Sequence, residues 1–193
     1  MKKLSTYLFL LLFSFQTSSW ADDIRDFQIE GMSIGDSLLD YASKEFINKE
    51  LNSKSTFFYR NNEFASISLW DLRKKFKIYD DVGIVIKPSD KDYKIYSIEG
   101  TFNFGQNINK CYEKQMQIVS DLKELFGDKV KLNSWSKKNL KKHMILVKYK
   151  TFKFDTGDEV HVICHDTREN YPRIEDTLYV AIDLEEFVKF VNK

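Results

Sequence analysis

The sequence predicts an α+β fold in which a helix-plus-antiparallel-meander unit occurs twice, with the helices packed on one face of the sheet. Residues 106–126 have strong helical periodicity. Residues 54–104 are rich in β-branched and aromatic side chains, and the turns between them leave no room for the crossover helices of a parallel sheet. A short motif also occurs in both halves of the chain. We therefore expect a single α+β domain over residues 22–193, or two lobes over 22–95 and 96–193.

The first 21 residues have the pattern of an export signal. Lys2 and Lys3 precede an apolar run at residues 7–15, and residues 19–21 (Ser-Trp-Ala) place small side chains where signal peptidase reads the chain. The run is shorter than the roughly 20 apolar residues that span a bilayer. We expect cleavage after Ala21 and a periplasmic or secreted protein without a transmembrane segment. A retained N-terminal anchor is the alternative.

The charge of the chain gives no sign of a nucleic-acid or membrane partner, and its composition is that of a folded domain. The chain has 30 Lys+Arg and 29 Asp+Glu, and loss of Lys2 and Lys3 with the signal lowers the formal charge from +1 to −1. This balance indicates neither a nucleic-acid partner nor a membrane surface. Aromatic residues make up 15% of the chain, whereas Gly and Pro number 7 and 2, which is typical of a packed core.

Residues 27–41, FQIEGMSIGDSLLDY, are predicted to lead into the first helix. The first of these residues alternate between apolar and polar, as in an extended segment. Ser37 followed by Asp40 is a capping-box pattern, in which the hydroxyl accepts a hydrogen bond from a backbone N–H of the first turn. Apolar residues then recur at helical spacing, so we expect one helix from Leu38 to Lys49.

The second half is predicted to begin with a long helix and to continue with strands. The helix over residues 106–126 has an apolar stripe that includes Cys111 and Met116, and Gly127 is suited to end it. We expect a final helix over residues 184–191 with Asp183 as its cap, and a polar, lysine-rich loop or helical turn at 136–143. Strands are expected at 56–59, 64–70, 82–87, 93–104, 129–135, 144–154, 159–164 and 177–182.

A motif of glycines and a polar capping residue occurs twice. Residues 29–38, IEGMSIGDSL, are similar to residues 98–108, IEGTFNFGQNI, with one residue inserted. In both copies an apolar helix is predicted to follow a cap, which is Ser37 in the first copy and Asn107 in the second. We interpret this match as a duplicated α+β unit, with chance agreement as the alternative.

The two cysteines are predicted to form a disulfide. An even number of cysteines favours a bridge in an exported protein. Cys111 lies on the apolar side of its predicted helix, and Cys164 shares a strand face with Val160 and Val162. Closing a loop of this length would contribute about 4 kcal/mol in the chain-entropy model. Two buried free thiols are the alternative.

The order of elements resembles two groups of bacterial proteins. The residues that carry the resemblance are 31–39, GMSIGDSLL, and their second copy. They are similar to the helix lead-in of small envelope proteins of the BamE/SmpA type and of the tandem-repeat β-lactamase-inhibitor-protein fold. The resemblance implies helices on one face of a sheet whose other face or edge binds a protein. This chain lacks a lipobox cysteine and is longer than the BamE type.

A serine-hydrolase interpretation rests on four residues. Gly35-Asp36-Ser37-Leu38 spells the signature of the GDSL (SGNH) hydrolases. That resemblance implies Ser37 as nucleophile, His161 as base, Asp158 as its orienting residue and Asn107 as an oxyanion donor. The family fold is a parallel α/β sandwich, whereas this sequence predicts antiparallel hairpins, and a cap is a sufficient role for Ser37. We therefore expect no catalytic residues and keep an esterase as the alternative.

No cofactor or metal site is predicted. His161 and His165 are four strand residues apart, about 13 Å, which is too far for one zinc ion. They are expected to face solvent, and His143 is not placed near them by any pattern.

Two surface features are candidates for contact with a partner. Trp135 lies beside a basic cluster of Lys137, Lys138, Lys141 and Lys142, which is either a solvated loop or a contact with an acidic partner or anionic envelope surface. The aromatic run at residues 57–59 is bulkier than one strand face needs, so it indicates an apolar outer patch or coverage by the other lobe.

These observations favour an exported, non-enzymatic protein that binds a protein or envelope component through a sheet face. The alternatives are a small secreted GDSL-type serine esterase and a carrier of a small ligand.

Overall fold

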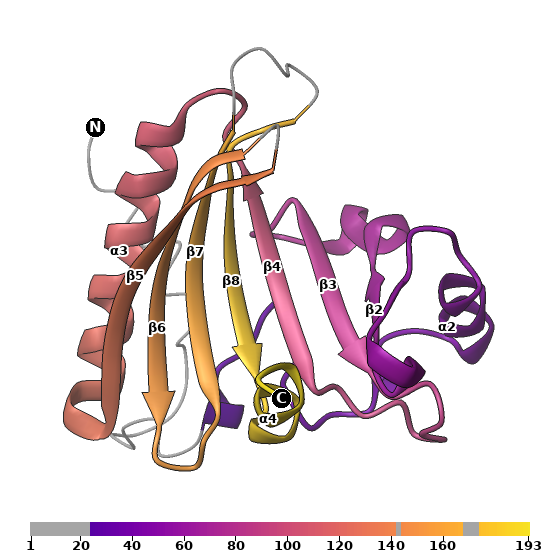
Figure 1. The fold of residues 1–193 in the computed structure, drawn as a ribbon. Coiled ribbons are helices and arrows are strands. Elements are labelled where there is room, and N and C mark those ends of the chain that lie inside the picture. Colours follow the sequence, from indigo (N-terminus) through magenta and orange to yellow (C-terminus); the bar gives the residue numbers. More distant parts are fainter. Residues whose placement is uncertain (1–23, 142–143, 168–173) are drawn as a thin grey trace.

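The computed structural model describes residues 24–141, 144–167 and 174–193 (Figure 1). The predicted signal peptide, Lys142 and His143 lie outside these residues. The described chain is an α+β structure built on one antiparallel sheet of eight strands in the order β1-β2-β3-β4-β8-β7-β6-β5. The strands are β1 Phe57–Phe58, β2 Ala65–Ser68, β3 Asp81–Ile86, β4 Ser97–Asn103, β5 Val130–Lys141, β6 Met144–Phe154, β7 Glu159–Thr167 and β8 Thr177–Asp183.

The sheet consists of two four-stranded meanders joined edge to edge. Strands β1 to β4 pair in sequence order, and so do β5 to β8. The last strand of each meander pairs with the other, with Gly100 of β4 opposite Val180 of β8. The antiparallel pairing predicted for both halves is confirmed, and the sheet is continuous across the expected lobe boundary at residues 95–96.

The long helix is α3 Ile108–Phe126, which begins two residues later than predicted and ends where predicted. The side chain of Asn107 accepts a hydrogen bond from the N–H of Lys110, and Gly127 ends the helix with φ of 56°. One detail of the predicted stripe is wrong: Met116 is exposed, and Gln115 is buried in its place. The Gln115 amide donates hydrogen bonds to the main-chain oxygens of Lys148 and Val162, and these offset the cost of its burial.

The helix expected over Leu38–Lys49 is two elements. Leu38–Asp40 is a 3-10 turn capped by Ser37, and α2 spans Lys44–Leu51. Ser43 divides the two because its backbone is extended and its hydroxyl accepts a hydrogen bond from the N–H of Phe46, which starts a new helix.

The final helix, α4 Glu185–Val191, is also capped differently from the prediction. Leu184, not Asp183, occupies the N-cap position and provides no side-chain cap. The carboxylate of Asp158, from the β6–β7 turn, accepts the N–H of Glu185 at 2.7 Å instead.

Strand β5 is longer than the sequence predicts. Residues 136–141, expected as a loop or helical turn, continue β5 along β6, with a register shift between Lys138 and Lys141. The backbone hydrogen bonds that β6 offers outweigh the polar composition of this segment.

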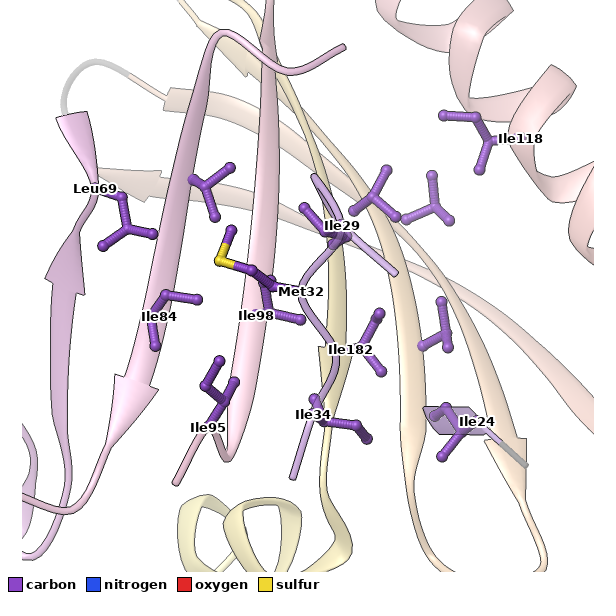
Figure 2. Close-up of a cluster of buried hydrophobic side chains, with 14 of the residues drawn as sticks. Ile24, Ile29, Met32, Ile34, Leu69, Ile84, Ile95, Ile98, Ile118 and Ile182 are labelled. Atoms are coloured by element: carbon purple, nitrogen blue, oxygen red, sulfur yellow. The ribbon is translucent and has the colours of Figure 1, made fainter. Parts of the chain in front are cut away.

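The core lies between the inner face of the sheet and the elements that cover it. Figure 2 shows Ile29, Met32 and Ile34 of the N-terminal segment lying against Ile98 of β4 and Ile182 of β8. Helix α3 covers the inner face over β7 and β8. Among the described residues, no helix combines the length and apolar character needed to cross a bilayer.

A disulfide attaches α3 to the sheet, as predicted. Cys111 of α3 and Cys164 of β7 are bonded, and their Cα atoms are 6.1 Å apart. Both side chains are fully buried, and Val160 and Val162 share their face of β7.

Candidate binding groove

The outer face of the sheet, opposite α3, contains a groove of about 720 Å³. Side chains of strand residues alternate between faces, so every second residue of β3 to β8 points toward this groove. Helix α4 closes one end, next to β8 (Figure 1). There Phe187 packs against Phe64 and Tyr59, with ring centroids 5.2 Å apart in both pairs. We call this space the outer groove. The polar and aromatic residues that matter most along it are Glu99, Asn133, Trp135, Tyr149, His161 and Asp183.

Glu99 lies on the floor of the outer groove between the two smallest side chains available. Its register partner on β3 is Gly83, and its partner on β8 is Ala181. Among the described residues, none donates a hydrogen bond to its carboxylate and none forms an ion pair with it. Burial, followed by the charges of Asp183 and Asp81, raises the Glu99 pKa to about 7, against a weaker opposing effect of His161.

His161 is the centre of a hydrogen-bonded network beside Glu99. Its Nε2 atom lies 3.2 Å from a Glu159 oxygen and 3.3 Å from an Asp183 oxygen. Its Nδ1 atom lies 3.0 Å from the hydroxyl of Thr151. The Nε2 atom can donate to either carboxylate, whereas the direction of the hydrogen bond between Nδ1 and the Thr151 hydroxyl depends on the tautomer of the ring. The expectation that His161 faces solvent is therefore only half right: the ring is on the outer face but half-buried.

An aromatic pair forms the groove wall near the β5 edge. The rings of Trp135 and Tyr149 are stacked, with centroids 3.7 Å apart and planes within 3°. Trp135 is 51% exposed. Asn133, two residues before Trp135 on the same face of β5, adds a side-chain amide that can form hydrogen bonds in the groove.

The predicted basic cluster is divided between the two faces. Lys137 shares the outer face with Trp135, whereas Lys138, the next residue of the same strand, points to the other side. Lys141 belongs to the end of β5. Trp135 and Lys137 therefore share a face of the sheet, and Lys138 lies on the other face.

The four residues of the hydrolase interpretation are each engaged elsewhere. The Ser37 hydroxyl donates to the main-chain oxygen of Asp92 and accepts from the N–H of Leu39. Asn107 caps α3, and Asp158 caps α4. His161 belongs to the network described above. No hydrogen bond or ion pair joins any two of these four residues, all of which the structure describes.

The aromatic run has separate roles for its members. Phe57 and Phe58 are 61% and 40% exposed on the edge strand β1. Tyr59 packs against α4, and burial, followed by the charges of Asp183 and Glu99, raises its pKa to about 12. Among the described residues, no group of three or more His, Cys, Asp or Glu side chains is arranged to hold a metal ion.

Glu99 is the site residue that the sequence did not single out. Glu99 belongs to the repeated motif, and Glu30 holds the matching position in the first copy. The two residues differ in their hydrogen bonds. The Glu30 carboxylate accepts the N–H groups of Lys77, Ile78 and Tyr79 at 2.7–2.9 Å. Two features of the sequence could have indicated this site. Glu99 is a single carboxylate within a predicted strand, and Gly83 is a glycine inside another strand, where a missing side chain often marks a close approach.

Comparison of the chain with protein-family models, with curated proteins and with solved structures gave no match.

Proposed function

We propose that the chain is an exported, non-enzymatic protein that binds a protein partner in the outer groove. One observation carries the proposal. The strands are covered on their inner face by α3 and the N-terminal segment, while their outer face keeps a groove of about 720 Å³ with an exposed tryptophan on its wall. Tryptophan and tyrosine are enriched where proteins bind each other, and a hollow flanked by them suits a protruding segment of a partner.

The strand order supports a duplicated origin for this binding face. Two meanders meet through β4 and β8, and each motif copy supplies a glycine with positive φ, Gly35 or Gly105, followed by a helix cap. In this proposal, edge-to-edge joining of two helix-plus-meander units creates a sheet face wider than either unit has alone. The tandem β-lactamase-inhibitor-protein fold, which the sequence resembles, would use its sheet in the same manner. Export agrees with the disulfide, which is typical of oxidising compartments.

A small-ligand carrier is the second candidate. The volume of the outer groove falls within the range of roughly 300–1,000 Å³ that is typical of ligand pockets. Native mass spectrometry of protein purified from its own cells distinguishes the two functions, because a carrier retains a small molecule whereas a partner-binding face does not.

Site-specific photo-crosslinking in cells tests the partner proposal. A photo-reactive amino acid replaces Asn133, which lines the outer groove, and a control replaces Glu113, which is exposed on α3. We expect a defined protein adduct from position 133 and none from position 113, and we expect Trp135→Ala to weaken the adduct. Absence of an adduct at position 133, or an equal adduct at position 113, would overturn the proposal.

A further inference from the structure

We propose that the outer groove recognises a basic side chain of its partner, a lysine ammonium or an arginine guanidinium, which binds the Glu99 carboxylate. This inference rests on the proposed function and names the chemistry that the groove selects.

The outer groove, of about 720 Å³, extends to Glu99, and no side chain at Gly83 covers the carboxylate. A Cβ atom added at Gly83 would have its nearest neighbours at 4.0 Å, and one of them is Oε1 of Glu99 itself. Ala181 on the opposite side carries only a methyl group. The two small neighbours leave the carboxylate accessible from the groove and bounded by strands on either side.

The charges around Glu99 leave a deficit of positive charge. Asp81 of β3 and Asp183 of β8 both disfavour its ionised form, and His161 of β7 is the one group that favours it. Among the described residues that line the groove, Lys153 is the only lysine or arginine, and it forms an ion pair with Glu159. An ionised Glu99 therefore has no lysine or arginine partner among the described residues that line the groove, and a cation from a partner would supply one.

The remaining groove surface suits the stem of the same side chain. Lysine and arginine pack their methylene stems along apolar surfaces, and a guanidinium also stacks on aromatic rings. Tyr59, on whose pKa the charge of Glu99 acts, and Phe187 provide such a surface in the same groove. The stacked pair of Tyr149 and Trp135 lies three and four strands from Glu99, so it would contact neighbouring residues of the partner. A neutral side chain could fill the space but would leave Glu99 unneutralised.

Titration with blocked amino acids tests the inference directly. The probes are N-acetyl-arginine amide and N-acetyl-lysine amide, and N-acetyl-citrulline amide is the neutral isostere of the first. Binding is measured on the full chain from NMR shifts of the Gly83 amide and the Trp135 indole. We expect saturable binding of the cationic probes at pH 8, and about tenfold weaker binding at pH 6 because Glu99, with its pKa near 7, is then mostly protonated.

Two variants give the controls. Glu99→Gln keeps the shape and is expected to lose binding and its pH dependence, whereas Glu113→Gln on the exposed side of α3 is expected to change neither. Equal binding of the citrulline probe, unchanged binding by Glu99→Gln, or no binding of the arginine probe would overturn the inference.

The photo-crosslinking assay separates this inference from the function on which it rests. If position 133 gives the same adduct in the wild type and in Glu99→Gln, and the arginine probe does not compete, the partner proposal stands and the basic side chain is refuted. If position 133 gives no adduct at all, the partner proposal itself fails.

Discussion

Ile98 and Glu99 are neighbours on β4, and they lie on opposite faces of the sheet. Ile98 is fully buried among the isoleucines of the N-terminal segment and β8. Glu99 lies in the outer groove with no hydrogen-bond donor among the described residues, in an environment that disfavours its charge. The inner face thus gains free energy from apolar burial, whereas the outer face keeps a group that opposes folding at neutral pH.

The difference between the faces indicates how one sheet can serve two purposes. Successive residues of a strand point to opposite faces, so a core residue can be substituted without changing a side chain of the groove. A destabilising group that persists on an accessible surface is typical of a functional position, because substitutions that stabilise such positions often reduce function. Three predictions test this division of roles.

The largest effect is expected from the disulfide beneath the inner face. Replacing both cysteines, Cys111→Ser with Cys164→Ser, should lower the free energy of unfolding by about 4 kcal/mol, because the unfolded chain loses the constraint of a closed loop. Urea denaturation of the oxidised wild type and the double variant measures the difference. A loss below about 1 kcal/mol would show that this attachment of α3 contributes little to the stability of the inner face.

A smaller loss is expected from the core side of β4. Ile98→Ala should lower the free energy of unfolding by about 3 kcal/mol through lost burial and the cavity that remains. Met116→Ala, at an exposed position of α3, is the matched control and should change stability by less than about 0.5 kcal/mol. If folded Ile98→Ala protein also lost the adduct at position 133, the two faces would be coupled.

The smallest effect, with the opposite sign, is expected at Glu99. Its pKa is raised from 4.5 to about 7 on folding, so the folded state holds a proton that the unfolded state releases. The stability from this proton is complete below pH 4.5 and is lost as the pH rises through 7. Glu99→Gln should therefore stabilise the protein by about 2 kcal/mol at pH 8, less than full burial would give because water reaches the groove.

Thermal and urea unfolding at pH 4 and pH 8 measure this gain. The variant and the wild type should be nearly equal at pH 4 and should differ at pH 8. Glu113→Gln, at an exposed site, should show no such change. A variant that is less stable than the wild type at pH 8 would mean that Glu99 supports the fold, and the contrast between the faces would fail.

The sequence was sufficient to predict the long helix and the disulfide, because both depend on residues that are close along the chain or on the face of a single element. The boundaries of α3 follow from the Asn107 cap, the apolar stripe and Gly127, and the disulfide follows from the faces on which Cys111 and Cys164 lie. The lysine-rich end of β5 did not follow, because only pairing with β6 makes residues 136–141 extended. Likewise, Ser43 divides the first helix through a cap that competes with the apolar periodicity.

The outer groove could not be predicted because it depends on strand register. Glu30 and Glu99 occupy equivalent positions of the repeated motif, yet the first accepts three backbone hydrogen bonds and the second accepts none from the described residues. Their difference arises from what lies beside them: the 77–79 segment for Glu30, and Gly83 with Ala181 for Glu99. Those neighbours are distant in sequence, and only the assembled sheet places them together.

The position of β8 has a consequence for the order in which the molecule can be completed. The last strand along the described chain, β8, lies in the middle of the sheet, between β4 and β7. The meander β1 to β4 therefore has no partner edge until residues 177–183 have been made. The pairing of β4 with β8 must be a late, long-range step, since everything from α3 to β7 lies between them along the chain. The sheet therefore cannot close before β8 has been made. This delay would favour the export that we propose, because an exported chain has to remain unfolded until it has crossed the membrane.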